Sequence, residues 1–261
     1  GEDYQAGSEL LPAGISIGGA ETAILSSLGL VRLPVFRQPH VSVLTSGDEV
    51  MAPGAPLQPG KIYDTNRAYL CGRLRELGLP AAYSCHCPDQ PELMAGELRR
   101  ALPASDLVIT AGGVSVGEKD IMHEALRLLG AQQLFWRVKL KPGTPTIAAV
   151  CEGKLIICLS GNPFGAAANF DLLVRPVLAA LTGDSCWVMK KFRAVLQNTF
   201  PKQGRTRRFL RGHTEGDKVW VTDGNHSSGA LSCLIGSNCL IEIPPEQAGA
   251  VAGTEVWVHL L

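Results

Sequence analysis

The chain has 261 residues, 46% of them hydrophobic and 18% charged, and its 24 basic and 24 acidic residues give a formal net charge of +0. This composition excludes an intrinsically disordered chain, and the charge balance argues neither for nor against a polyanionic partner. No apolar run approaches the length needed to cross a bilayer, and the start does not resemble a signal peptide. The 8 cysteines include no Cys-x-x-Cys pair, so neither a zinc site nor a disulfide framework is predicted.

Three blocks follow one another along the chain. Residues 1–38 predict a turn-rich opening, a helix over Ala20–Leu28 that ends at Gly29, and a strand over Val31–Phe36. This block is too small to fold alone. Residues 39–182 alternate apolar strands with helices, which predicts an α/β domain with a parallel sheet covered on both faces. Residues 186–261 consist of short alternating runs between Gly, Asn and Pro, which predict a small β-barrel or sandwich.

The α/β block has recognisable element ends. Asp64 is predicted to cap a helix that runs to Leu77, and Asp89 with Glu92 is predicted to form a capping box. The expected strands are 41–44, 79–84, 106–110, 147–150 and 155–159, and the other expected helices are 119–129 and 164–181. The third block carries eight basic residues between Lys190 and Arg211 without an acid, which indicates either a solvated strand face or an anion site.

Several loops are predicted to share one edge of the sheet, because ligands of parallel α/β sheets bind beyond the carboxyl ends of the strands. The segment 112–117 joins a buried strand to a helix through two glycines, and its free N–H groups suit a phosphate or another oxyanion. Residues 160–163 close another strand and offer a second set of N–H groups. Carboxylates at Glu49, Asp89 and Asp120 are expected at the same edge.

Basic residues alternate at Arg137, Lys139 and Lys141, so all three project to one side if this segment is extended. Such a row is unfavourable unless an anion or carboxylates oppose it. Each motif alone also has an ordinary interpretation, as a helix cap or a solvated turn. Cys85-His86-Cys87 suggests a metal site, but on a strand the imidazole and the two sulfurs point to opposite faces, which favours buried thiols in a reducing cytoplasm.

Five motifs occur in a fixed order: Ser46-Gly47-Asp48-Glu49, the segment 59–67, the segment 112–120, Lys141-Pro142-Gly143-x-Pro145 and Gly161-Asn162-Pro163. Together they closely resemble the MoeA / gephyrin E-domain family of molybdopterin molybdenumtransferases, and the resemblance spans essentially the whole chain. It implies insertion of molybdate into adenylylated molybdopterin, with Mg²⁺ and with release of AMP. It also implies a three-layer molybdopterin-binding domain followed by a small β domain.

The resemblance assigns roles residue by residue. Glu49, Asp89 and Asp120 would be the catalytic carboxylates, with Glu49 and Asp120 as metal ligands. The molybdopterin-binding residues would be Asp64, Asn66, Gly112, Gly113, Val114, Ser115, Ser160, Gly161, Asn162 and Pro163. The contacts to molybdate or phosphate would be Arg137, Lys139, Lys141, Arg211 and Ser228. Four segments depart from the usual family pattern. Ser160 replaces a proline, and Thr144 replaces a frequent lysine. Arg207-Arg208 precedes Phe209 where an acidic residue is common, and the segment 225–229 is a variant form.

The resemblance also implies that residues 1–38 are the remnant of an N-terminal linker domain, and that an inserted domain of the family is missing before them. We expect small-molecule substrates, a homodimer at full length, and transient contact with an adenylyltransferase or with molybdenum-cofactor enzymes. A truncated chain is expected to be inactive alone, and no nucleic-acid or membrane partner is expected. The alternatives are a molybdopterin adenylyltransferase, which typically has a single domain, and a scaffold protein that kept the fold without catalysis.

Overall fold

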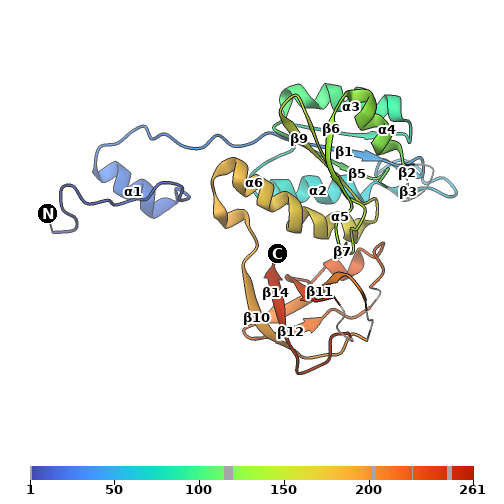
Figure 1. The fold of residues 1–261 in the computed structure, drawn as a ribbon. Helices are drawn as coiled ribbons and strands as arrows, with labels where there is room; N and C mark the ends of the chain where they lie inside the picture. The colour runs from blue at the N-terminus through green and yellow to red at the C-terminus, as the bar shows by residue number, and fades with distance from the viewer. Residues whose placement is uncertain (1, 115–119, 202–203, 225, 246–248) are drawn as a thin grey trace.

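Two sheets organise the chain in the computed structural model, which describes residues 2–114, 120–201, 204–224, 226–245 and 249–261 (Figure 1). Figure 1 shows the α/β domain above the β domain, with the N-terminal segment extending away to one side. The α/β domain contains β1 (Val41–Ser46), β2 (Val50–Met51), β3 (Ile62–Tyr63), α2 (Thr65–Glu76), β4 (Tyr83–Cys87), α3 (Pro91–Ala101), β5 (Leu107–Ala111), α4 (Ile121–Leu129), β6 (Gln132–Trp136), β8 (Ile147–Cys151), β9 (Lys154–Leu159), α5 (Pro163–Asn169) and α6 (Arg175–Thr182).

The main sheet has the strand order β4-β1-β5-β9-β8-β6. Its first four strands are parallel, as predicted, whereas β8 and β6 run antiparallel to their neighbours. The reversal occurs because β8 and β9 are joined by a tight turn in which Glu152 and Gly153 have φ values of 52° and 74°. Positive φ at both central residues is typical of a hairpin turn, which can only join antiparallel strands.

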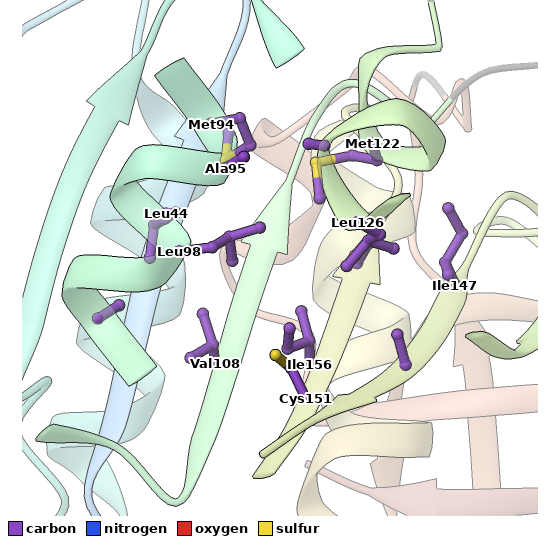
Figure 2. Packing of buried hydrophobic residues seen from close by; sticks show 14 of the residues in the cluster. Leu44, Met94, Ala95, Leu98, Val108, Met122, Leu126, Ile147, Cys151 and Ile156 are labelled. Carbon is purple, nitrogen blue, oxygen red and sulfur yellow. The ribbon is translucent and has the colours of Figure 1, made fainter. Parts of the chain in front are cut away.

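Helices cover both faces of this sheet. Figure 2 shows Met94 and Leu98 of α3 in one cluster with Met122 of α4 and with Val108 and Ile156 on the strands. A second core lies on the opposite face, between the strands and the helices α2, α5 and α6, and includes Val41, Val43, Leu70, Leu74, Ile109 and Phe170. Successive residues of one strand thus enter different cores, and this burial on both faces explains why the strands are almost entirely apolar.

Two predicted element ends are wrong. The strand expected over 79–84 is β4 at Tyr83–Cys87, because Leu79 still closes helix α2 and Pro80 has no N–H for a sheet ladder. The capping box expected at Asp89 is absent, since α3 has Gln90 at its N-cap without a side-chain cap. The carboxylate of Asp89 instead accepts from the backbone N–H of Asp48.

Residues Pro163–Thr182 form a nearly continuous helix in which a π-helical turn, Phe170–Val174, joins α5 to α6. Contrary to the sequence expectation, this run is long and apolar enough, by length and composition alone, to cross a membrane. Of its most apolar window, 67% is buried inside the protein, as in a core helix of the α/β domain.

The β domain contains β10 (Lys191–Leu196), β11 (Arg207–Glu215), β12 (Lys218–Val221), β13 (Cys239–Ile243) and β14 (Glu255–Leu260). Its strand order is β12-β10-β14-β13-β11-β7, and an additional β12–β11 pairing closes the sheet into the predicted barrel. The strand β7 (Leu140–Lys141) comes from the α/β block and pairs in parallel with the start of β11. A short piece of the first domain therefore completes the sheet of the second, at the junction seen in Figure 1.

The N-terminal segment forms α1 (Gly19–Ser27), close to the predicted helix, but the strand predicted over 31–36 is absent. Val31 is 93% exposed and Val35 71% exposed, and no neighbouring strand pairs with this stretch in the described structure. An isolated extended segment without a partner ladder does not form a stable strand. Apolar side chains of this segment and residues after α6 together line a cavity of about 910 Å³. Ser16 of the segment donates to Asp184 of the loop after α6 at 2.6 Å.

The Arg37–Asp106 pair anchors the segment to the α/β domain, and we expect acid to weaken this anchor. Hydrogen bonds from Arg37 at 2.6 and 2.8 Å lower the pKa of Asp106 from 3.8 to about 2, helped by the backbone N–H of His40. Because the folded-state pKa is depressed, the stabilisation is present above about pH 3.8 and is lost as the pH falls through 2. The amide of His40, which donates to Oδ2 of Asp106 at 2.8 Å, should therefore exchange faster in this range in the wild type and be fast at every pH in Asp106→Asn. Equal exchange in the two proteins at neutral pH would contradict the anchor.

Candidate active site

The loops that follow β1, β5 and β9 touch one another at the carboxyl edge of the sheet. A Cβ atom on Gly112 would lie 2.4 Å from the backbone oxygen of Ser46 and 2.8 Å from its Oγ. A Cβ atom on Gly161 would lie 3.3 Å from Cα of Gly112. Gly112 also has a φ of 102°, so only glycine suits this position. The convergence predicted from the sequence is therefore present in the fold.

The loop of residues 141–146 lies beside the loop after β9. A Cβ atom on Gly165 would lie 3.1 Å from Cβ of Ser160 and 3.3 Å from the backbone nitrogen of Gly143. The buried amide of Asn169 donates to the oxygen of Gly143 at 2.7 Å and thus fixes this loop against α5. Sequence reasoning missed Asn169, because an asparagine inside an apolar helix gives no signal of the loop that it contacts.

The loops after β1 and β4 are joined by two aspartates. The backbone N–H of Asp48 donates to Oδ2 of Asp89 at 3.3 Å, and that of Asp89 donates to Oδ1 of Asp48 at 3.0 Å. Oδ1 of Asp89 is buried and has no hydrogen-bond partner in the described part of the chain. Glu49 lies next to this pair with an exposed side chain. An acceptor oxygen of Asp89 is thus available to a ligand or a water molecule at the edge.

Asp120 immediately precedes α4 and lies near a second cluster. Its carboxylate is 3.7 Å from Nε2 of His123, whose Nδ1 is 2.8 Å from Oε1 of Gln133. The ring of His123 stands edge-on to Trp136 at 4.9 Å, and the guanidinium of Arg137 lies 4.6 Å above that indole. Sequence reasoning missed His123, although its i, i+3 spacing from Asp120 on a helix was a readable signal.

The predicted row of three basic side chains is wrong. Arg137 has a φ of 69°, which breaks the extended conformation on which the alternation depended. Arg137 therefore belongs to the Trp136 cluster, whereas Lys141 lies in β7 and Lys139 lines a cavity with Arg205 and Arg207. The two ends of the row are in different surroundings, so the three cations do not face one anion together.

The second predicted set of free N–H groups, at 160–163, is largely used within the protein. Asn162 donates its N–H to Oγ of Ser160 at 3.3 Å, and Pro163 has none. The N–H of Phe164 donates to the backbone oxygen of Ser228 at 2.8 Å. A loop of the β domain thus covers the start of α5, and an anion there would have to rely on Gly161 and on side chains.

Arg211 also differs from its predicted role as an anion contact. The residue is 0% exposed, and its guanidinium stacks on the ring of Phe164 at 4.1 Å and donates to the backbone oxygens of Ala230 and Ser227. Burial lowers the pKa of Arg211. This arrangement holds the 227–230 loop in place and turns the charge away from solvent, so Arg211 positions the loop that carries Ser228.

The predicted molybdopterin contacts at the start of α2 have structural partners. Asp64 caps the helix through the N–H of Arg67 at 3.0 Å and also accepts from Oγ1 of Thr45 at 2.6 Å. The amide of Asn66 donates to the oxygen of Gly161 at 2.8 Å, which ties α2 to the loop after β9. Asp64 is therefore a buried cap, whereas Asn66 lies at the edge where the loops meet.

The Gly-Gly loop is described only up to Val114. The side chain of Val114 is 4% exposed and packs in the core with Ile121, so only its backbone is available to a ligand. The φ of Gly113 is 64°, and a Cβ atom there would lie 2.6 Å from Ile121. Ser115 and the rest of the segment 115–119 lie outside the described residues.

The described residues contain no group of three or more His, Cys, Asp or Glu that could hold a metal ion. The Cys85-His86-Cys87 segment forms β4, and burial raises the pKa of both thiols, that of Cys87 to about 11. These cysteines are thus protonated packing residues, as the strand alternation predicts. An Mg²⁺ ion, unlike zinc, needs only one or two carboxylates when substrate phosphates and water complete its shell.

Comparison with known proteins identifies the family to which the chain belongs. Residues 42–180 match the family described as a probable molybdopterin binding domain, and residues 193–261 match the MoeA C-terminal region (domain IV). The chain belongs to the MoeA family of molybdopterin molybdenumtransferases. It is 34% identical over 270 residues to the molybdopterin molybdenumtransferase of Haemophilus influenzae, which covers 100% of this chain and 67% of that protein. With the enzyme of Bacillus subtilis it shares 32% identity over 270 residues.

Solved structures of the family agree with the architecture. A molybdopterin biosynthesis MoeA protein from Pyrococcus horikoshii superposes with a TM-score of 0.80 and 28% identity, covering 100% of this chain and 63% of that one. A second structure of the family from the same organism gives a TM-score of 0.82 with 31% identity, over 95% of this chain and 60% of the other. The chain spans 61% of the Bacillus subtilis relative, somewhat less than two thirds of its length.

Proposed function

We propose that the protein inserts molybdenum into adenylylated molybdopterin, with release of AMP. The observation that supports this most is the direct contact of the Ser46, Gly112 and Gly161 loops at one sheet edge, in a chain of the MoeA family. The β domain favours this function over that of an adenylyltransferase, because residues 193–261 match the MoeA C-terminal region.

In the proposed reaction, water adds across the phosphoric anhydride, so that AMP leaves and molybdopterin keeps its own phosphate. Molybdate then bonds to the two dithiolene sulfurs, and the two thiol protons leave with one molybdate oxygen as water. No electron transfer is needed. Lys141 would attract the molybdate dianion beside Ser160, since their loops are in contact through Gly143 and Gly165.

The carboxylates divide the remaining work in this proposal. The unpartnered Oδ1 of Asp89 would accept a hydrogen bond from the attacking water or from a substrate N–H. Glu49 and Asp120 would hold Mg²⁺, and their hard oxygen atoms fit this ion. When bound, Mg²⁺ would neutralise part of the negative charge on the anhydride phosphates. The chain's own contribution is to fix these groups on loops that glycine packing holds together.

Other features of the proposal concern the protein in the cell. We propose a cytoplasmic homodimer that meets its adenylyltransferase or molybdenum-cofactor enzymes transiently. The exposed apolar side chains of Val31, Val35 and Phe36 support a protein–protein contact at the N-terminal segment. Residues 1–38, 39–182 and 186–261 are proposed as the linker remnant, the molybdopterin-binding domain and the β domain.

A pair of variants tests the function. In the intact protein, Asp89→Asn is expected to lower molybdenum insertion roughly a hundredfold, because an amide presents one acceptor where the carboxylate has two and carries no charge. Asp217→Asn, on an exposed turn of the β domain, is the matched control and should keep full activity. Molybdenum incorporation and AMP release are measured in parallel. Wild-type protein that binds neither molybdopterin nor molybdate would instead indicate a scaffold.

A further inference from the structure

A second cavity lies at the junction of the two domains, lined by residues of the α/β block and of the β domain. Its volume is about 470 Å³, within the range of roughly 300–1,000 Å³ that small-molecule sites occupy. Lys139, Arg205 and Arg207 line it together with Leu172, Leu173 and Phe209. Of the site residues that were predicted from the sequence and that the structure describes, Lys139 alone lines this cavity. It was predicted as a contact to molybdate or phosphate, together with Arg137 and Lys141.

Strand pairing brings these cations together from distant parts of the chain. β7 pairs in parallel with β11, with Leu140 opposite Arg207. Lys139 and Thr206 each precede a paired residue, so they enter the cavity wall side by side. The positive charges are therefore placed by backbone hydrogen bonds between two domains, and not by the chance position of a long side chain.

Within the described residues, Arg207 is the one cation of the three with a counter-charge. Its Nε is 3.2 Å from Oε1 of Glu242, and Oε2 of the same carboxylate lies 2.8 Å from Lys191 and from His259. Lys139 and Arg205 form no ion pair or hydrogen bond with any residue in the described parts of the chain. Among the residues that the structure describes, none that lines the cavity is acidic. Like charges around a shared hollow repel one another unless an anion enters it.

The apolar part of the lining includes residues with unusual backbone geometry. Leu172 and Leu173 are neighbours in the π-helical turn Phe170–Val174, and both line the cavity. Such turns inside α-helices occur frequently at functional sites. Phe209 on β11 is 4% exposed and adds an aromatic surface. A ligand in this cavity would thus meet both cations and hydrocarbon surface.

We propose that this cavity binds a small organic anion, with a phosphate or carboxylate group at Lys139 and Arg205 and an apolar or aromatic body against Leu172, Leu173 and Phe209. The site is separate from the proposed reaction centre and does not depend on the proposed function. Arg207, restrained by Glu242, lines the same hollow and adds to its positive potential.

Phenyl phosphate is a suitable probe, because it combines a dianionic head with an aromatic ring. We expect calorimetric titration to show that it binds the wild type several-fold more tightly than inorganic phosphate does. The double variant Lys139→Ala/Arg205→Ala should lose at least about tenfold in affinity, since it removes both charge-assisted contacts to the phosphate. Lys218→Ala, which removes an exposed cation of the β domain outside the cavity, should bind like the wild type.

Two further measurements make the result decisive. Denaturant unfolding of each variant verifies that it is folded, and the exposed position of Lys139 and Arg205 predicts near-wild-type stability. Lys141→Ala locates the probe, because it alters the proposed reaction centre and leaves the cavity intact. The inference is overturned if the double variant binds phenyl phosphate normally, if Lys141→Ala abolishes binding, or if inorganic phosphate binds equally well.

Discussion

Replacing Asp171 with alanine is expected to lower the free energy of unfolding by about 3–5 kcal/mol. Asp171 is 1% exposed within the π-helical turn, and its Oδ1 accepts from Arg73 at 2.7 Å and from Arg175 at 3.4 Å. Burial raises the pKa of Asp171, while the two guanidinium groups oppose this shift and favour the carboxylate. Without the carboxylate, the buried Arg175 would lose the Asp171 ion pair, and Arg73 would keep only the exposed Glu76 as a partner.

The matched control is Glu76→Ala, which removes the other carboxylate that contacts Arg73. The side chain of Glu76 is 62% exposed, so we expect this variant to lose no more than about 1 kcal/mol. Denaturant-induced unfolding, followed by circular dichroism, measures both values. Similar losses in the two variants would show that burial does not determine the strength of this network.

Gly112→Ala is expected to cost at least about 2 kcal/mol of stability and to weaken ligand binding at the sheet edge. The new methyl group would lie 2.4 Å from the backbone oxygen of Ser46, on a residue whose φ is 102°. Because that oxygen belongs to the last residue of β1, relief of the contact requires the ends of β1 and β5 to separate. The affinity for molybdopterin should therefore fall together with the melting temperature.

Gly96→Ala serves as the control for this substitution. Gly96 lies inside α3, and a Cβ atom there would have no neighbour within 4 Å. We expect this variant to gain about 0.5–1 kcal/mol, because alanine favours the helix over glycine. If both glycine variants changed stability in the same direction, the contact with Ser46 would not be the cause of the first result.

The sequence predicted the α/β order and most helix ends because these depend on local signals. Asp64 caps α2 and Gly78 follows its end with a φ of 75°, both as expected from residue type alone. The failures have non-local causes. Asp89 has the residue type of a cap, but its carboxylate accepts from Asp48 on the neighbouring loop, 41 residues away along the chain.

The location of the candidate site at the sheet edge was predictable from the sequence, whereas the contacts of its individual side chains were not. Loops after adjacent strands must meet at one edge, so Ser46, Gly112 and Gly161 could be grouped without coordinates. The side-chain environments could not be predicted in the same way. Arg211 looked like an exposed cation, yet the barrel closes around it and Phe164 of the other domain covers it.

The parallel pairing of Leu140 with Arg207 and of Lys141 with Arg208 has a mechanical consequence for the protein. The same short peptide that carries Lys141 leads directly into Gly143, which Asn169 fixes to α5. A rotation of the barrel relative to the helices must therefore either move Lys141 or break the pairing of β7 with β11. The position of Lys141 relative to Ser160 is thus coupled to the orientation of the barrel.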